Sequence, residues 1–533
     1  MFTENDFTAF SGDTEDISIL HNDYNLSELA MVFPDVNSIL VPKKAQYNLS
    51  KYVSKALLRE IDPNVGIAVE KCLVVLSNLA STYYSEENPW KALNSVILHE
   101  QTKNDSNTFI YKKIIDELKT GTKTGAFIEV GDSYEVGVQS KMYRLTDQYL
   151  NVGLTEYIIK DSGIIATRNR LFYRQLSSAM SNPICANLVQ IYPKIELPTS
   201  PELLAIGKKL VKDGRTTKKG KLLTMQNKHK NHYWNDWQNR SFIEDNIKLF
   251  EFLTSRGFMI PSAGDTKSGG RVIDSFTLMP SWIREQLTID GKRLCECDYT
   301  ALHPNIAVKL YGGKESYITH QNVAEKASID VVDVKLEHLS FFNKSWKGMQ
   351  KSPLYKFYQE TEPMMLENIC KDKKENGYKV TSRRMFEAEV NIIADVITDL
   401  NAKGVQVLYV YDALLCEEKD KAEVVETMNR IIQEHGVKTK VKSNGLDESK
   451  ALEPSTAQYE LTSEINLYEI LPAMNFSVQE SMDIITGLNR SVVQMKELIS
   501  YIGYQRKQQQ YNDYTGVIIT AEHVNLLRNM VRM

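Results

Sequence analysis

The sequence lacks several of the patterns that assign a chain to a simple class. It has only six cysteines, of which Cys295 and Cys297 are close together, and no second pair completes a zinc pattern. No run of about 18 apolar residues exists, so we expect no transmembrane helix. The acidic, polar start differs from a secretory signal. We therefore expect a cytoplasmic protein with free thiols.

Further absences narrow the classes of function. The 533 residues contain no internal repeat and no low-complexity tract. The glycines and lysines at 208–221 lack phosphate-loop spacing, so ATPase activity is unsupported. Hydrophobic residues make up 42% and charged residues 25%, as in an ordinary globular protein of about three or four domains. The net charge of −4, taken alone, argues against a nucleic-acid partner.

Positive charge is nevertheless concentrated in one segment. Residues 208–240 contain ten Lys and Arg but only two Asp, and aromatic residues lie near the end of this segment. Cationic side chains neutralise phosphates, and aromatic faces stack on bases. A solvated basic loop is the alternative. The residues that we expect to contact nucleic acid here are Lys218, Lys219, Lys221, Lys228, Lys230, Trp234, Trp237 and Arg240.

Hydrophobic periodicity and turn residues predict the other elements. Helical patterns cover about 48–85 and 87–98, and a strand-rich stretch covers 126–145. Four prolines mark a linker near 182–202. A helix is expected at 241–256, with Ser241 as its N-cap. We divide the chain into an N-terminal region without an assigned role (1–200), a basic segment (201–263), a central part of alternating strands and helices (264–442), a linker (443–460) and a helical tail (461–533).

Two aspartates in the central part carry the chemistry. Asp298 stands at the end of a strand predicted at 293–299, before a helix at 302–310 whose first turn accommodates His303 and Pro304. Asp412 lies in a turn between two short strands of 405–418. An amphipathic helix over 385–404 precedes those strands.

Both aspartates have strongly apolar neighbours. A carboxylate at the end of a buried strand is costly unless it is paired or binds a metal. Two such groups brought together could hold two cations, which clamp the attacking and leaving oxygens of a phosphoryl transfer. Mg²⁺ suits such a site because it needs few protein carboxylates. The alternative is that each aspartate caps a neighbouring helix, and the pattern alone does not bring the two together.

Residues 264–442 resemble the palm and fingers of family A (DNA polymerase I-like) polymerases. The resemblance rests on CDYTALHPNIA at 297–307, LYVYDALLCEE at 408–418 and GGRV at 269–272, and it covers about a third of the chain. It implies an α+β fold with an antiparallel palm sheet, packed helices and small fingers. The basic segment would form a helical, thumb-like part, with helical regions at both ends of the chain.

The resemblance also implies roles for individual residues. Asp298 and Asp412 would be the catalytic, metal-binding pair, and Tyr299 would offer its backbone carbonyl to the metal and lie beside the nucleotide. Arg271 and Arg284 would contact the primer–template. Lys335 would grip the triphosphate, with Lys344 and Lys347 as rivals; an ordinary surface lysine on an amphipathic helix is the alternative.

Three departures from the family pattern matter. Ala413 replaces a carboxylate that follows the second aspartate in the family. His303 stands where family A has the Glu that screens the sugar 2′-hydroxyl; the same stretch is similar to the first motif of family B polymerases, where Tyr does the screening. A bulky ring at this position predicts a preference for deoxynucleotides. The fingers also look short, because only 114 residues separate the two aspartates.

The resemblance predicts a template-directed DNA polymerase that extends a primer 3′-hydroxyl with two Mg²⁺ ions, or Mn²⁺ in their place. Its partners would be a DNA primer–template and dNTPs, in a bacterial or phage-infected cell, and the gene could belong to a phage or mobile element. The alternatives are primase, terminal transferase or RNA polymerase activity on the same palm. A polymerase-like replication or defence factor that binds nucleic acid without catalysis is a further alternative.

Two remaining signals stay outside this prediction. Asp13–Glu15 and Tyr157–Asp161 are formally similar to proofreading exonuclease motifs, but no apolar strand leads into Asp13 and no middle motif accompanies them. In the tail, apolar residues at 485–502 repeat with three-and-four spacing on a helix expected at 478–507. That helix either packs on its own chain or mediates self-association or partner binding.

Overall fold

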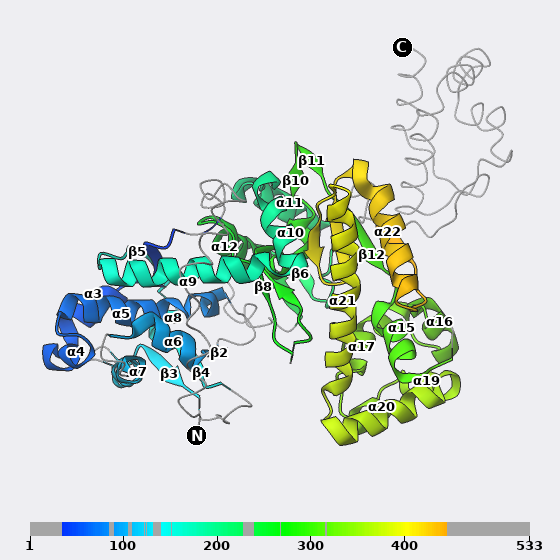
Figure 1. Cartoon of the computed structure of the whole chain (residues 1–533), viewed down its shortest axis with the longest axis horizontal. Coiled ribbons are helices and arrows are strands. Elements are labelled where there is room, and N and C mark those ends of the chain that lie inside the picture. Colours follow the sequence, from blue (N-terminus) through cyan, green and yellow to red (C-terminus); the bar gives the residue numbers. More distant parts are fainter. Residues whose placement is uncertain are drawn as a thin grey trace, which may run out of the picture. The chain divides into compact units, whose positions relative to one another are not determined.

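A computed structural model describes residues 33–444 except 34, 85–89, 105–108, 122, 124, 132–139, 151, 227–238, 267 and 315–316 (Figure 1). These residues form a mixed α+β structure in which helices predominate and the sheets are small. The described residues belong to one compact unit, 1–448. The expected helix at 478–507, most of the linker at 443–460 and the stretch Asp13–Glu15 lie outside the described residues.

Helix α5 (Val65–Ser77) is the centre of the first hydrophobic core. Every residue from 68 to 76 is buried, since other helices and strand β1 pack around it. A small antiparallel sheet of order β2-β4-β3 and the antiparallel pair β1-β5 complete this part. The other elements are β1 (Ser38–Pro42), α3 (Ala45–Tyr52), α4 (Lys55–Ile61), η3 (Ala80–Tyr84), β2 (Lys91–Ala92), α6 (Ser95–Thr102), α7 (Ile110–Thr120), β3 (Ile128–Val130), β4 (Met142–Leu145), α8 (Asp147–Leu150) and β5 (Leu154–Ile158).

The expected long helix over 48–85 is wrong in its continuity. The side chain of Ser54 accepts a hydrogen bond from Ala56 N and starts α4, and Asn64 does the same for Gly66 N at the start of α5. Such caps satisfy backbone donors at a new helix start, so the pattern divides into separate helices. Residues 87–98 likewise contain strand β2 before helix α6 begins at Ser95.

The stretch Val65–Tyr84 is long and apolar enough to cross a membrane by length and composition alone. This differs from the expectation that no such stretch exists. However, 67% of its most apolar window is buried within the protein, which is the behaviour of a core helix.

The prediction of a linker near 182–202 is wrong. Pro183 begins helix α10 (Pro183–Ile191), and Pro201 lies in the first turn of α11 (Ser200–Lys212), where proline's missing N–H is not needed. Helix α10 is largely buried, and Asn187 exchanges hydrogen bonds with the backbone of Val407. The long helix α9 (Ser162–Met180) leads into it, and η4 (Tyr192–Lys194) follows it.

A four-stranded antiparallel sheet of order β13-β14-β12-β15 lies in the second, larger core. Its strands are β12 (Cys295–Tyr299), β13 (Leu408–Val410), β14 (Ala413–Cys416) and β15 (Val441–Asn444). In β12 the side chains of Cys295, Cys297 and Tyr299 are buried, while Glu296 and Asp298 are partly exposed. The predicted strands and the turn at 411–412 are therefore present. The six cysteines are all free.

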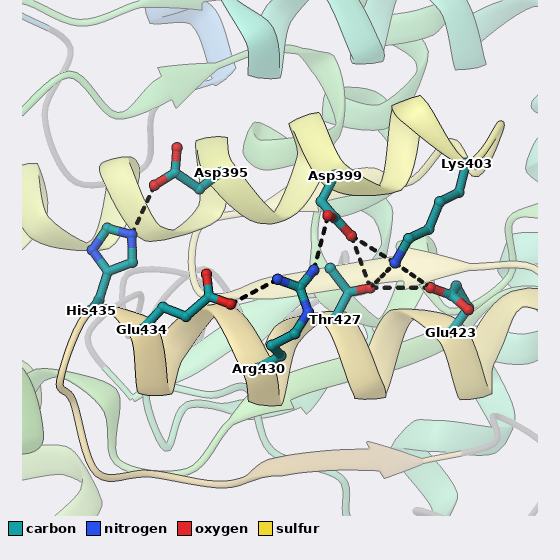
Figure 2. Close-up of polar contacts among 8 residues, drawn as sticks. All are labelled: Asp395, Asp399, Lys403, Glu423, Thr427, Arg430, Glu434 and His435. Atoms are coloured by element: carbon teal, nitrogen blue, oxygen red, sulfur yellow. Dashed lines mark hydrogen bonds and ion pairs between the residues drawn. The ribbon is translucent and has the colours of Figure 1, made fainter.

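Helices α15 (Leu302–Tyr311), α21 (Val380–Ala402) and α22 (Lys421–Glu434) accompany the sheet, with η6 (Glu418–Asp420) before α22. Figure 2 shows the polar contacts that join α21 to α22. Arg430 Nη2 lies 2.8 Å from Asp399 Oδ1, and Lys403 Nζ lies 2.7 Å from Asp399 Oδ2 and 2.6 Å from Glu423 Oε1. Asp399 therefore links helices α21 and α22.

The remaining elements lie between β5 and α21. The predicted helix at 241–256 is α12 (Ile243–Thr254), but its N-cap residue is Phe242, which makes no capping hydrogen bond through its side chain, and not Ser241. Strands β6 and β7 are parallel neighbours. The other elements are β6 (Leu222–Thr224), β7 (Arg240–Phe242), β8 (Ser262–Ala263), β9 (Val272–Ile273), α13 (Ser275–Leu278), α14 (Ser281–Arg284), β10 (Thr288–Ile289), β11 (Lys292–Arg293), α16 (His320–Ala327), α17 (Val331–Phe341), α18 (Trp346–Gln350), α19 (Tyr355–Thr361) and α20 (Pro363–Asn376).

Candidate active site

The sheet brings Asp298 and Asp412 together at one end of the central strands β12 and β14. Asp298 pairs with Ala413 in the register of β12 and β14, and Asp412 is the residue just before Ala413. Asp412 itself lies in the two-residue turn between β13 and β14, where Val410 pairs with Ala413. Two carboxylates that are 114 residues apart in the sequence are thus neighbours across adjacent strands.

Left-handed backbone conformations flank both aspartates. Tyr411, directly before Asp412, has φ 61°, and Ala301, which caps α15 after the strand of Asp298, has φ 49° and ψ 48°. A non-glycine residue in this region costs of order 1–3 kcal/mol and persists only where the surroundings impose it. Such residues cluster at functional sites. The tight turns they allow bring both carboxylates to the end of the sheet.

The carboxylate pair is electrostatically unfavourable without a cation. Burial raises the pKa of Asp298 to about 8, and the charge of Asp412 adds to the effect. Burial also raises the pKa of Asp412, and the negative charge of Glu389 is the next largest cause. In addition, Asp298 Oδ1 is buried without a hydrogen-bond partner among the described residues. A buried oxygen without a partner is costly in a protein interior and needs an explanation.

The donor set fits Mg²⁺ bound mainly through substrate. The described residues contain no group of three or more His, Cys, Asp and Glu side chains that could enclose an ion. Mg²⁺ nevertheless binds commonly through one or two carboxylates, with phosphates and water as its other ligands. Asp298 and Asp412 could provide those carboxylates, and the partnerless Oδ1 of Asp298 is a ready ligand atom.

Tyr299 can contribute to such a site only through its backbone. Its ring is 2% exposed, its hydroxyl donates to the carbonyl oxygen of Met428 at 2.8 Å, and burial raises its pKa. The expected place of Tyr299 beside a nucleotide therefore stays a prediction that concerns its backbone. The ring anchors β12 to helix α22, which fixes the position of the neighbouring Asp298.

Arg271 and His303 both contact the carboxylate of Glu389, a residue that the sequence analysis did not identify. Arg271 Nε lies 2.8 Å from Glu389 Oε1, and Nη2 lies 2.6 Å from Oε2. His303 Nε2 lies 2.7 Å from the same Oε2. The side chain of Glu389 is fully buried. Burial works to raise its pKa, but His303 and Arg271 outweigh burial, and the net shift is downward.

One sequence signal could have identified Glu389. The buried positions of α21 recur at three-to-four spacing, through Met385, Glu389, Ile392 or Ile393, and Val396. A carboxylate within such an apolar stripe is almost never buried unless it is paired. The signal names the residue but not its partners, because Arg271 and His303 come from distant parts of the chain.

Glycine permits the close approach that brings Arg271 to this carboxylate. Gly269 has φ +67°, and a Cβ added to it would lie 2.5 Å from Phe386 Cβ and 2.8 Å from the backbone nitrogen of Glu387. The backbone at 269 therefore touches α21 directly. Two residues later, the guanidinium of Arg271 stacks 3.6 Å from the centre of the Phe386 ring.

Two lysines, Lys442 and Lys218, lie near Asp298. Lys442 pairs with Asp298 in the register of β12 and β15, and Lys218 Nζ lies 3.6 Å from Glu296 Oε1 on the same strand. The charges of Lys218 and Lys442 act to lower the pKa of Asp298, against the larger effect of burial. Lys335 is exposed on α17. Lys442 was missed by the sequence analysis, because only the strand register reveals its place beside Asp298.

Two neutral histidines lie beside these lysines. Burial lowers the pKa of His320 to about 4, and the charges of Lys335 and Lys442 contribute. Burial lowers the pKa of His338 to about 3, with His320 and His303 contributing. His320 Nδ1 lies 3.0 Å from His338 Nδ1, and His338 Nε2 lies 2.7 Å from the Tyr358 hydroxyl. At neutral pH these rings therefore add no positive charge to the site.

The other predicted nucleic-acid contacts have mixed placements. Arg284 is mostly buried and donates to the carbonyl oxygens of Phe276 and Met279, so it supports the turn after α13. Lys219 is exposed, Lys221 is partly exposed, and Arg240 lies in β7. Of the rival triphosphate lysines, Lys344 pairs with Glu337, and Lys347 is exposed on α18. The positions Lys228, Lys230, Trp234 and Trp237 lie outside the described residues.

Comparison with known proteins gives limited information. No family model matches the chain, and no curated protein matches it. Among solved structures, it is similar to the POL domain of Pol1 from M. smegmatis in complex with a DNA primer-template and dNTP. The two are 11% identical with a TM-score of 0.33, over 53% of this chain and 73% of that chain. This likeness to a polymerase domain is weak, and it assigns no activity to the chain.

Proposed function

We propose that this protein is a DNA polymerase-like nucleotidyltransferase that extends a primer 3′-hydroxyl. The observation that carries the proposal is the proximity of Asp298, on β12, to Asp412, in the turn before the adjacent strand β14, with one buried oxygen of Asp298 that has no hydrogen-bond partner among the described residues. Such a pair is costly in the isolated chain and becomes favourable when cations bind. The fold thus maintains an unfavourable charge arrangement that a metal-dependent reaction would use.

Each side chain has a part in the proposed reaction. Asp298 and Asp412 would hold two Mg²⁺ ions, which in this class of chemistry activate the attacking hydroxyl and neutralise charge on the transferred phosphoryl group. The exposed Lys335, together with Lys218 and Lys442, would attract the triphosphate to the aspartate pair. Catalysis would then consist mainly of positioning and charge neutralisation.

Primer extension by the full chain tests this proposal. A labelled primer, with and without template, is incubated with dNTPs or with rNTPs and either Mg²⁺ or Mn²⁺. We expect templated extension with dNTPs, and a loss of at least about 10³-fold in Asp298→Asn or Asp412→Asn. Asp399→Asn serves as the matched control, since Asp399 lies on α21 in the ion-pair network of Figure 2.

The same assay separates the alternatives. Extension that needs no primer or no template would identify a primase or a terminal transferase, and a preference for rNTPs would identify RNA synthesis. The absence of a carboxylate at position 413, which is Ala413, is the feature that favours these alternative activities. Binding of primer–template without incorporation under any condition would refute the enzymatic proposal in favour of a binding factor.

A further inference from the structure

Helix α21 presents two side chains, one turn apart, that each engage Arg271 and His303. Phe386 lies under the Arg271 guanidinium at 3.6 Å and beside the His303 ring, with ring centres 5.5 Å apart. Glu389 accepts hydrogen bonds from Arg271 at 2.8 and 2.6 Å and contacts His303 at 2.7 Å. Two residues of α21 thus restrict both side chains at once.

The chemistry of the carboxylate determines the state of the histidine. An ionised carboxylate only accepts hydrogen bonds, so His303 Nε2 must carry a hydrogen to bind Glu389 Oε2. Nε2 then cannot also accept a hydrogen bond from Arg271 Nη2, which lies 3.2 Å away. In the neutral ring, Nδ1 is therefore the acceptor. Glu389 thereby fixes both the tautomer and the orientation of the ring.

We infer that Glu389 is a positioning residue that holds His303 in place to select the sugar of the incoming nucleotide. This inference rests on the proposed function. His303 lies in the first turn of α15, shortly after Asp298, and it is close enough to Asp412 to influence the pKa of that carboxyl group. A ring held on two sides cannot turn aside to accommodate an additional hydroxyl, whereas a released ring can.

A merely structural ion pair would behave differently. Removal of such a pair lowers stability but leaves the choice between two substrates unchanged. If Glu389 acts through His303, its loss must increase use of ribonucleotides and must have no further effect once His303 is gone. Double-mutant cycles detect this dependence as non-additivity.

The experiment measures kcat and KM for insertion of one dNTP and of the matching rNTP by the full chain. Glu389→Ala should raise the relative kcat/KM for the rNTP by about tenfold or more, mainly through a lower rNTP KM, because the ring is free to move. Glu389→Gln should have a smaller effect, since its amide retains one acceptor oxygen. In a His303→Ala background, neither substitution should change the discrimination further.

Glu129→Gln is the matched control. Arg144 binds Glu129 through the same two-bond geometry, at 2.8 Å for both contacts, in the N-terminal sheet. Glu129→Gln should leave the discrimination between dNTP and rNTP unchanged. Unfolding curves of each variant report whether the fold is retained. Unchanged discrimination in both Glu389 variants, an additive effect with His303→Ala, or an equal effect of Glu129→Gln would overturn the inference. A wild-type chain without extension activity would instead overturn the proposed function, and the inference with it.

Discussion

Asp298 is a residue at which function and stability oppose each other. Its folded-state pKa of about 8 lies above the ordinary value of 3.8, chiefly because of burial. Between these pH values the folded state retains a proton that the unfolded chain releases. The free energy of unfolding of the metal-free protein should therefore fall as pH rises from about 4 to about 8, by at most about 1.4 kcal/mol per pH unit from this group.

Asp298→Asn should remove this contribution. We expect the variant to show a flatter pH dependence and, at pH 8 without divalent cations, a higher free energy of unfolding than the wild type. Urea unfolding in EDTA across this pH range measures both quantities. Asp399→Asn, which removes a favourable ion pair, should change stability in the opposite direction. A wild-type slope that persists in Asp298→Asn would contradict the assignment of the shifted pKa.

The residues of the candidate site differ in how readily they can be identified from the sequence alone. Asp298 and Asp412 stand out because a carboxylate beside a strongly apolar strand needs an explanation. Glu389 is harder to find, because its signal lies within the stripe of a helix that otherwise follows the expected pattern. Lys442 could not be found from the sequence, because its proximity to Asp298 depends on the pairing of β12 with β15 across more than a hundred residues.

At the scale of elements, helix α21 positions most of the candidate site. Its end at Ala402 leads into β13, its buried face carries Glu389, and its backbone touches Gly269. The sequence predicted this helix and the strands after it, because their patterns are local and strongly periodic. It failed at 182–202, where prolines begin helices instead of interrupting them, since the role of a proline depends on whether the following residues continue a helix.

Gly269→Ala should disturb this contact between elements. The substitution combines a left-handed φ with a Cβ only 2.5 Å from Phe386, so we expect a loss of about 2–4 kcal/mol. Gly291→Ala is the matched control, because Gly291 has φ +68° with no atom within 4 Å of the added Cβ. It should cost only about 1–2 kcal/mol.

Urea unfolding of both glycine variants gives the comparison. The difference between them isolates the packing against α21, since both glycines have nearly the same positive φ. Gly269→Ala should also lower primer extension, because a displaced backbone moves Arg271 away from Glu389. Equal losses of stability in the two variants would show that the approach to α21 contributes nothing.

For the whole molecule, net charge is a poor guide to partners. The total of −4 averages the basic residues of 208–240 with acidic residues elsewhere, including aspartates whose proposed role is to bind cations. The structure adds that Lys218 lies close enough to act on the pKa of Asp298 while its side chain remains 64% exposed. An exposed lysine in that place is available to phosphates, which makes salt dependence the appropriate measurement.

We predict that affinity for a DNA primer–template falls steeply as salt concentration rises, with a slope of log K against log[salt] of about −0.9 for each phosphate neutralised. Lys218→Gln should make the slope less steep by about one unit, because it removes one phosphate contact. Lys356→Gln removes the same charge from an 85% exposed side chain on α19 and should leave the slope unchanged. Fluorescence anisotropy with a labelled duplex, from about 50 to about 200 mM salt, measures the slopes. An equal change in both variants would mean that only the net charge matters, whereas a change confined to Lys218 would localise the DNA contact to the lysines around Asp298.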